Sequence, residues 1–395
     1  MTTQRKILTL IIIVFILIIG GLFFLYQSFV QTDTEPTGNG TGGTGSGGSI
    51  LFPNTGQGET SGIGTTTGPS SIATLRQISS VPVSGAVIFT DEETAVIRYV
   101  ERSSGHIFET TSTSLELNRI SNTTIPRIQR SFWAPDGSTV ILQYLDENET
   151  LKSFYGKVAP ETGALEGWFL GNNISDVAVA PDGDMLYVQK IGGGVQGIIS
   201  NFDGTNSATI FSSTQRDWRP LWMGKEVTFT TNPARDITGF MYQIQKGEYK
   251  KILSRDGLIT NINPDGGNIL FSLSNSRETN LFVYNQKTKE TVEVPFRTLA
   301  EKCAWSGNTV VFCASPHRVT EGIVPDDWYK GSLSFSDDIW SYNTETDEAQ
   351  LVYDALSNEQ IFDAINLRID SEGKVLLFTD KNNLTLWALS LKERL

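Results

Sequence analysis

The chain has 395 residues, of which 39% are hydrophobic and 19% charged, and its formal net charge is −13 at pH 7. This acidity argues against a nucleic-acid-binding protein, because such proteins present a basic surface to phosphate groups. Two histidines, two cysteines and four methionines leave little material for zinc, haem or copper sites. We therefore expect no metal, no cofactor and no nucleic-acid partner.

The first predicted element is a membrane anchor over residues 7–26. This stretch of twenty residues carries no charge and consists mostly of Ile, Leu, Val and Phe. As a helix it would span roughly 30 Å, the thickness of a bilayer core. Residues 1–6 carry an Arg and a Lys, and no further basic residue occurs before Arg76, so the positive-inside rule predicts a cytoplasmic N-terminus and an extracytoplasmic remainder. A cleaved signal peptide is the alternative, although residues 27–30 form a poor cleavage site.

A flexible linker is predicted over residues 27–72. Twelve of the 37 glycines lie between positions 38 and 68, interleaved with Thr and Ser. Such a composition buries too little apolar surface to offset the entropy lost on ordering. A Gly-rich coil of this length has a root-mean-square reach of roughly 35–40 Å. We expect this segment to hold a folded body, residues 73–395, away from the membrane.

Residues 73–395 contain a repeated pattern of two strand-like runs joined by a glycine turn. Three copies carry Pro-Asp-Gly, at 135–137, 181–183 and 264–266. Weaker copies have their turn glycine at 224, 307 and 373, and a turn without glycine occurs at 91–94. Successive turn glycines are 41 to 46 residues apart, except for a step of 66 before the last one.

This period predicts an all-β protein, a seven-bladed β-propeller. Proline presets φ near −65° and glycine supplies a positive φ, so the chain reverses between two buried strands. Two further alternating runs follow each hairpin, and four antiparallel strands in about 42–46 residues are typical of one propeller blade. Trp133, Trp222 and Trp305 end the first strands of their repeats, where we expect them to pack between blades.

The same pattern predicts how the ring closes. The last repeat shows only three strands, over 361–369, 374–379 and 384–389. Residues 74–79 resemble residues 117–121, the predicted outer strand of the first blade. We expect residues 74–79 to supply the missing fourth strand of the last blade, which removes an open sheet edge.

The Trp-Ala-Pro-Asp-Gly turn at 133–137 and the Ala-Pro-Asp-Gly turn at 180–183 resemble those of the WD40-like (PD40-type) repeats in TolB-like propellers. The arrangement, with Arg-Tyr-Val-Glu at 98–101 and Pro-Asp-Asp-Trp-Tyr at 325–329, is also similar to membrane-anchored propellers of candidate-phylum bacteria. The resemblance implies the propeller fold and an extracytoplasmic location, periplasmic or at the cell surface. The TolB family has an additional N-terminal α/β domain that is not predicted here, so its role in the envelope is not carried over.

Cys303 and Cys313 flank the turn of the sixth blade. A three-residue loop, 307–309, would place them directly opposite each other, whereas a two-residue loop would place them on opposite faces. An exported location permits a disulfide between them. We expect a structural disulfide, with a pair of buried free thiols as the alternative.

The long step before the last turn predicts an insertion of residues 314–338 in the sixth blade. It joins the second and third strands and therefore emerges on the face that carries the blade-to-blade connections, where propellers usually bind partners. Trp328 and Tyr329 either form a contact surface with neighbouring charges or fold inward as the core of the loop itself. The candidate binding residues are His317, Arg318, Asp326, Asp327, Trp328 and Tyr329. Four arginines are predicted on the same face: Arg216, Arg219, Arg235 and Arg277.

Two classes of function remain. The first is a membrane-tethered, non-catalytic module that binds an envelope protein or a glycan; the scarcity of histidine and the absence of an acid–base motif favour it. The second is an extracytoplasmic hydrolase or lyase acting on glycans or peptides. That alternative requires a pair of carboxyl groups at close range in the centre of the ring, which sequence cannot locate. We favour the binding module.

Overall fold

The computed structural model describes residues 75–391, apart from 275–278 and 319–320. The membrane anchor predicted over residues 7–26 and the linker predicted over 27–72 lie outside the described residues. Among the residues that are described, no helix has the length and apolar character required to cross a bilayer.

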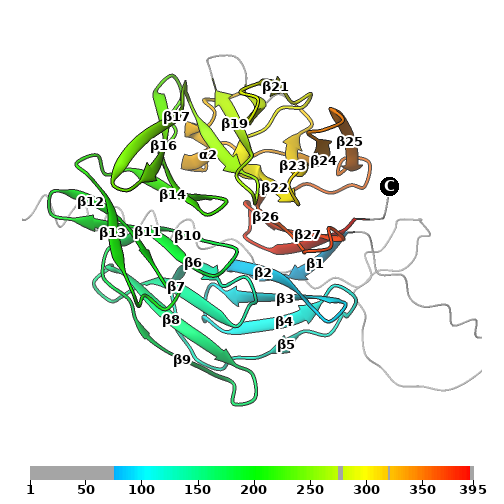
Figure 1. Ribbon diagram of the computed structural model, residues 1–395. Helices are drawn as coiled ribbons and strands as arrows, with labels where there is room; N and C mark the ends of the chain where they lie inside the picture. The colour runs from blue at the N-terminus through cyan, green and yellow to red at the C-terminus, as the bar shows by residue number, and fades with distance from the viewer. Residues whose placement is uncertain (1–74, 275–278, 319–320, 392–395) are drawn as a thin grey trace, which may run out of the picture. The chain divides into compact units, whose positions relative to one another are not determined.

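Seven antiparallel sheets of four strands each form the described part of the chain (Figure 1). This confirms the predicted seven-bladed propeller. We number the blades by the order of their innermost strands, β2, β6, β10, β14, β18, β22 and β26, so that each of blades one to six uses four consecutive strands. Blade seven is the exception, since its outermost strand is β1.

The strands of blades one to three are β2 Val83–Asp91, β3 Thr94–Glu101, β4 Ile107–Thr111, β5 Asn118–Arg119; β6 Ile128–Trp133, β7 Thr139–Leu145, β8 Leu151–Ala159, β9 Ala164–Phe169; and β10 Ile174–Val179, β11 Met185–Ile191, β12 Gly194–Ser200, β13 Ala208–Ser213. Those of blades four and five are β14 Trp218–Met223, β15 Glu226–Thr231, β16 Thr238–Gln245, β17 Glu248–Asp256; and β18 Ile259–Ile262, β19 Asn268–Ser274, β20 Thr279–Asn285, β21 Thr291–Glu293.

Blade six contains the two short helices of the described chain in addition to its strands, and blade seven contains the two ends of the propeller. The elements of blade six are the 3₁₀-helix η1 Ala300–Lys302, β22 Cys303–Ser306, β23 Val310–Pro316, the helix α2 Asp326–Lys330, β24 Asp337–Asn343 and β25 Glu348–Tyr353. The strands of blade seven are β26 Ala364–Ile369, β27 Val375–Asp380, β28 Leu386–Ser390 and β1 Leu75–Ser79.

The glycine turns between first and second strands have the predicted conformation. The turn glycines have positive φ, for example 67° at Gly137, 96° at Gly183 and 79° at Gly266. In each of these three turns the glycine N–H donates to the carbonyl three residues earlier at 3.0 Å. The corresponding turn of blade one has no glycine; Glu92 adopts the positive φ there, at 53°.

Ring closure by the N-terminal strand is confirmed. β1 pairs antiparallel with β28, from Leu75 opposite Leu389 to Ser79 opposite Leu386, and lies beside the C-terminal strands in Figure 1. Arg76 extends from β1 to blade one, where its Nη2 donates to the carbonyl of Thr111 at 2.7 Å. β1 therefore completes one blade and contacts the next.

Hydrophobic clusters lie between neighbouring blades as well as within them. Residues of blades one and seven share one cluster, and those of blades five and six share another. Two of the predicted tryptophans also donate across a blade boundary: Trp133 Nε1 to the carbonyl of Gly85 at 3.4 Å, and Trp222 Nε1 to that of Ala178 at 3.1 Å. Trp133 and Trp222 thus join blades two and four to the blades that precede them, whereas Trp305 Nε1 has no hydrogen-bond partner among the described residues.

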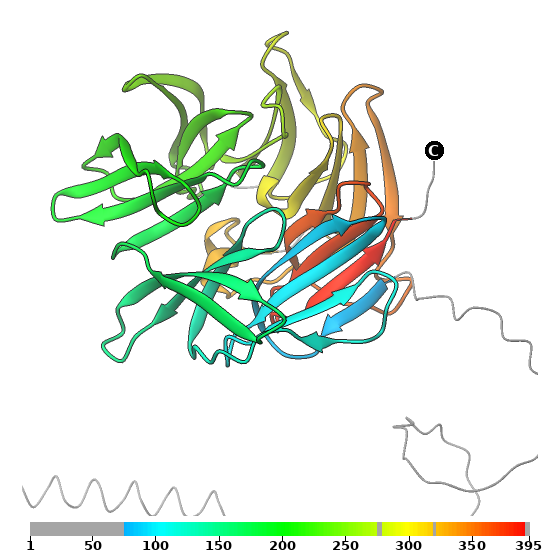
Figure 2. The same cartoon turned by 60° about the horizontal axis from the view of Figure 1, so that its bottom comes forward.

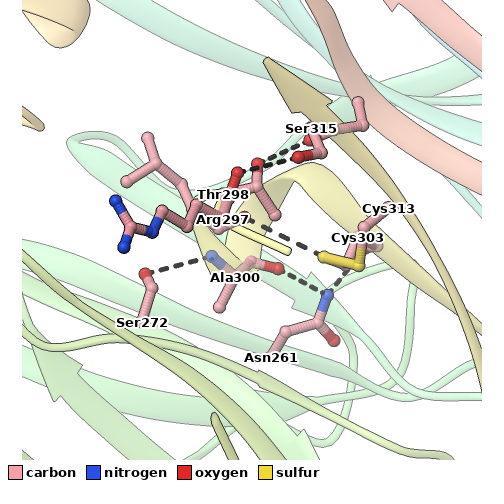
Figure 3. Close-up of a disulfide and its surroundings, with 10 residues drawn as sticks. Asn261, Ser272, Arg297, Thr298, Ala300, Cys303, Cys313 and Ser315 are labelled. Carbon is pink, nitrogen blue, oxygen red and sulfur yellow. Dashed lines mark hydrogen bonds between the residues drawn. A yellow bond between two sulfur atoms is a disulfide. The ribbon is translucent and has the colours of Figure 1, made fainter. Parts of the chain in front are cut away.

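A disulfide joins Cys303 and Cys313, which are directly opposite each other in β22 and β23 (Figure 3). The register places Ser306 opposite Val310, so the loop has the three residues 307–309. Nearby, Asn261 of blade five donates through Nδ2 to the carbonyls of Ala300 at 3.1 Å and Cys303 at 2.7 Å. These contacts fix the segment 300–303, and with it Glu301 and Lys302, at the start of the innermost strand of blade six.

Candidate functional site

The insertion of blade six occupies residues 317–336, a shorter stretch than the predicted 314–338. The difference arises because β23 and β24 continue to pair as far as Pro316 opposite Asp337. Its one described helix, α2, lies within the ring of blades rather than outside it (Figure 2). The insertion therefore folds back over the centre of the propeller, and contacts from blades four, six and seven hold it there.

Two acidic residues at the start of α2 are used to fix the helix. Asp326 Oδ2 accepts the backbone N–H of Arg235, in the β15–β16 connection of blade four, at 2.8 Å. Asp327 Oδ2 accepts the backbone N–H of Ile323 at 2.8 Å, and its carbonyl accepts the N–H groups of Ser332 and Leu333. Gly331 then ends the helix with φ of 78°. Both carboxylates thus serve the shape and position of the insertion.

Trp328 points into the propeller and is only 4% exposed. Its Nε1 donates to Asp363 Oδ2 at 2.8 Å, and its ring is stacked on Phe335 with centroids 6.0 Å apart. Of the two arrangements that the sequence left open, Trp328 adopts the inward one, in which it forms part of the core of the insertion.

Tyr329, in contrast, is 37% exposed and contacts one residue of blade four and one of blade six at the surface. Its hydroxyl donates to Glu301 Oε1, and the guanidinium of Arg219 lies 5.2 Å from its ring centroid. Arg219 Nη1 also donates to Glu301 Oε2 at 3.1 Å. We call Arg219, Glu301 and Tyr329 the Tyr329 cluster; it joins β14 of blade four to η1 and α2 of blade six.

The electrostatics of the Tyr329 cluster stabilise its ordinary charge states. Burial alone would lower the pKa of Arg219, but the Glu301 carboxylate and Tyr329 raise it above its ordinary value. Burial and the negative charge of Glu301 raise the pKa of Tyr329. The Arg219 guanidinium therefore stays charged and the Tyr329 phenol stays neutral across the physiological pH range.

His317 and Arg318 lie at the base of the insertion, where β23 ends, rather than on α2. The backbone N–H of His317 donates to the carbonyl of Ser336 at 3.1 Å, across the two ends of the insertion. Arg318 is exposed. Among the predicted arginines, Arg216 is exposed and Arg277 lies outside the described residues. The structure thus divides the six candidate residues between a helix inside the ring and the base of the insertion.

Sequence reasoning missed a second group, which we call the buried ion cluster: Lys302, Asp337 and Asp363. Lys302 Nζ donates to Asp337 Oδ2 at 2.7 Å and to Asp363 Oδ1, and all three side chains are 0% exposed. Burial raises the pKa of Asp337 to about 6, because the opposing effect of the Lys302 ammonium is incomplete and Asp363 adds a like charge. Asp337 and Asp363 lie 35 and 61 positions after Lys302 in the chain, so no local sequence motif could reveal the cluster.

The buried ion cluster bears directly on the enzyme alternative. Asp337 and Asp363 are a close carboxyl pair near the centre of the ring, as a glycan-cleaving enzyme would use. Both are fully buried, however, and Lys302 lies between them. A sugar substrate has no access to this pair in the structure. Within the described residues there is also no group of three or more His, Cys, Asp or Glu side chains suited to a metal ion.

The fold and this face define the class of protein, a seven-bladed β-propeller with an insertion over its centre. No protein-family model matches the chain, and no curated protein sequence matches it. Among solved structures, it is similar to the β-propeller domain of the trilobed protease from Pyrococcus furiosus, with 14% identity and a TM-score of 0.51 over 78% of this chain and 95% of that one.

Two other solved structures are similar to the chain. A puromycin-hydrolysing peptidase of Mycobacterium tuberculosis has 12% identity and a TM-score of 0.51, over 76% of this chain and 52% of the peptidase. TolB from Acinetobacter baumannii has 14% identity and a TM-score of 0.44, over 66% of this chain and 63% of TolB. At these identities the likeness shows the propeller fold alone.

Proposed function

We propose that this protein is a non-catalytic binding module, tethered outside the cytoplasmic membrane, whose propeller binds a protein of the cell envelope through the face that carries the insertion. The Tyr329 cluster is the observation that supports the binding surface. Tyrosine and arginine are the residue types most often responsible for affinity at protein interfaces. Here they are held in place by a carboxylate before any partner arrives, which reduces the entropy lost on binding.

The location outside the membrane is part of the proposal. It is supported by the uncharged stretch 7–26 with its preceding basic residues, and by the Cys303–Cys313 disulfide. Disulfides persist in oxidising compartments and are rare in the cytosol. The periplasm or the cell surface is consistent with both features.

The experiment is affinity capture from detergent-solubilised envelope with the full chain and two variants. Tyr329→Ala removes the exposed ring of the Tyr329 cluster, and Tyr249→Ala removes a more exposed tyrosine on β17, the outer strand of blade four. We expect Tyr329→Ala to weaken capture by roughly tenfold or more, as loss of an aromatic anchor does, and Tyr249→Ala to leave it unchanged. Equal capture by all three proteins would contradict the proposed surface. Cleavage of envelope glycans without any capture would favour the hydrolase or lyase instead.

A glycan ligand is the second candidate, and a different surface favours it. A hollow of about 180 Å³ lies between blades two and three, lined by Trp168, Phe169, Asp203 and Thr205 among others. Trp168 and Phe169 are 48% and 65% exposed, and Trp168 is held by a hydrogen bond of 3.1 Å from Nε1 to the carbonyl of Asp203. Fixed aromatic faces beside polar groups suit the apolar face of a sugar ring. Loss of glycan binding in Trp168→Ala with normal protein capture would assign the two ligands to separate surfaces.

A further inference from the structure

The buried ion cluster places an amine between two carboxyl groups away from solvent. Lysine is almost never fully buried unless it is paired, and Lys302 contacts both Asp337 and Asp363. The rings of Phe335 and Trp328 lie over its Nζ, with centroids at 4.7 and 5.4 Å. The fold thus holds the Lys302 ammonium nitrogen against the carboxyl groups of Asp337 and Asp363, with two aromatic rings around it.

The two oxygens of Asp363 have different surroundings. Oδ2 accepts hydrogen bonds from Trp328 Nε1 at 2.8 Å and from the backbone N–H of Phe335 at 3.0 Å; Ser334 Oγ also lies 3.2 Å from it, although its shorter hydrogen bond is donated to Asn382 Oδ1. Oδ1 contacts Lys302 Nζ. Two donors on one oxygen stabilise the negative charge that develops when a nucleophile attacks the carboxyl carbon. The arrangement around Oδ2 is therefore an oxyanion hole for attack at Cγ of Asp363.

Asp337 occupies the position of a proton carrier. Its Oδ2 accepts from Lys302 Nζ at 2.7 Å and from the backbone N–H of Ala364 at 2.8 Å. Its Oδ1 is buried and has no hydrogen-bond partner in the described residues. A buried carboxyl group with a pKa of about 6 exchanges protons readily near neutral pH. No other titratable side chain contacts Lys302 Nζ in the described part of the chain, although Lys381 lies 4.9 Å from the centroid of the Trp328 ring on the same enclosure.

We propose that Lys302 and Asp363 condense to an isopeptide bond, with Asp337 as the proton relay. Asp337 accepts a proton from the Lys302 ammonium and passes it to Oδ1 of Asp363, and the free amine then attacks Cγ of the neutral acid while Oδ2 is held by Trp328 Nε1 and the backbone N–H of Phe335. The protons lost by the nitrogen pass through Asp337 to Oδ1, which departs as water. One N–C bond forms and one C–O bond breaks; the ammonium and the carboxylate become a neutral amide and one water molecule, and Asp337 is regenerated.

Placement of the reacting groups favours this condensation. Well-oriented groups within one molecule behave as if present at roughly 10⁵–10⁸ M, whereas an amine and a carboxylate free in water scarcely condense. The bond would also remove the penalty of keeping an ammonium and a carboxylate in an apolar site. Because Lys302 precedes β22 and Asp363 precedes β26, it would join blades six and seven covalently beneath the insertion. The cross-link is independent of any partner and of the Cys303–Cys313 disulfide.

The deciding measurement is the mass of the purified full chain after denaturation, reduction and alkylation. We expect a mass lower by one water molecule than that of the sequence with both cysteines alkylated. Trypsin should fail to cleave after Lys302 and should release residues 298–318 and 331–368 as one branched peptide. The unmodified mass together with normal cleavage after Lys302, from protein that is folded by circular dichroism, would overturn the proposal.

Two variants test the assigned roles. Lys302→Arg keeps the positive charge but supplies no nucleophilic amine, so it should show the unmodified mass. Asp337→Asn leaves the reacting pair in place but removes the relay, and we expect the bond to form roughly 100-fold more slowly in freshly refolded protein, with partial rescue by Asp337→Glu. Formation at the wild-type rate in Asp337→Asn would overturn the relay, and a water loss in Lys302→Arg would overturn the assignment of the amine.

Discussion

Asp337 lies where burial and ionic pairing act on its carboxyl group in opposite directions. Removal from water favours the neutral acid, and the Lys302 ammonium at 2.7 Å favours the carboxylate. Burial is the larger effect, so the pKa of Asp337 rises from 3.8 to about 6. A buried ion pair of this kind is weak evidence for added stability. The raised pKa does, however, make the free energy of unfolding depend on pH.

The first prediction concerns the pH dependence of unfolding of protein whose mass shows that Lys302 and Asp363 have not condensed, because the amide would remove the ammonium beside Asp337. Between pH 4 and 6 the folded state holds a proton on Asp337 that the unfolded state has lost, so the free energy of unfolding falls as pH rises through this range. The shift of about 2 pKa units corresponds to about 3 kcal/mol, which is fully lost above pH 6. Asp337→Asn cannot ionise, so we expect its urea unfolding curves to lack this component.

The measurement compares the free energy of unfolding of the two proteins at several pH values from 4 to 7. Every other carboxyl group is common to both proteins, so the change in their difference with pH isolates Asp337. A constant offset between them reports the lost contacts with Lys302 and is not part of the prediction. If the difference stays the same from pH 4 to 7, the raised pKa of Asp337 is wrong.

At the scale of single elements, the glycine turns show how much the local sequence specifies. The Pro-Asp-Gly pattern predicted both the turns and the strands beside them, because φ preferences and alternating burial act over a few neighbouring residues. The closing strand was also predictable, since residues 74–79 resemble an outer strand elsewhere in the chain. The positive φ values of Gly137 and Gly183 confirm this local chemistry.

The insertion shows where such prediction ends. The pattern located an insertion in blade six but could not decide whether Trp328 points inward, because that depends on Asp363, 35 residues away. Likewise, Lys302 gives no local signal of the two carboxylates that surround it. A lysine between the apolar residues Leu299, Ala300, Cys303 and Ala304 was the one available hint of a buried cation. Contacts between blades depend on how segments distant in the sequence pack together, so they cannot be predicted from a periodicity over a few neighbouring residues.

The second prediction compares two turn glycines that share a backbone conformation but differ in their surroundings. Gly137 and Gly183 both have positive φ, which costs alanine about 1 kcal/mol or more. A Cβ on Gly137 would overlap the ring of Phe89 in blade one, whereas a Cβ on Gly183 would meet nothing within 4 Å. We therefore expect Gly137→Ala to lower the free energy of unfolding by about 1–3 kcal/mol more than Gly183→Ala does, because of overpacking. Chemical denaturation measures the free energy of unfolding of both variants. Equal decreases in the two would show that Phe89 moves aside at no cost.

At the scale of the whole propeller, stability depends on a ring that the two ends of the described chain close together. β1 covers the edge of β28, and its Leu75 and Ile78 pack against clusters that include residues of blades six and one. An uncovered strand edge would expose unpaired N–H and C=O groups and invite association with other chains. Closure therefore affects both the stability and the solubility of the propeller.

The third prediction tests this closure with two truncated chains. A chain that begins at Ile72 keeps β1, whereas one that begins at Val81 lacks it and leaves β28 as an edge. Loss of the pairing and of two partly buried aliphatic side chains should cost roughly 3 kcal/mol or more, which for a domain of this size lowers Tm by at least about 5 °C. Differential scanning calorimetry gives the two Tm values, and size-exclusion chromatography should show self-association only in the shorter chain. Equal Tm values would mean that β1 is dispensable, and that the remaining strands of blade seven hold the ring closed through their contacts with blades six and one.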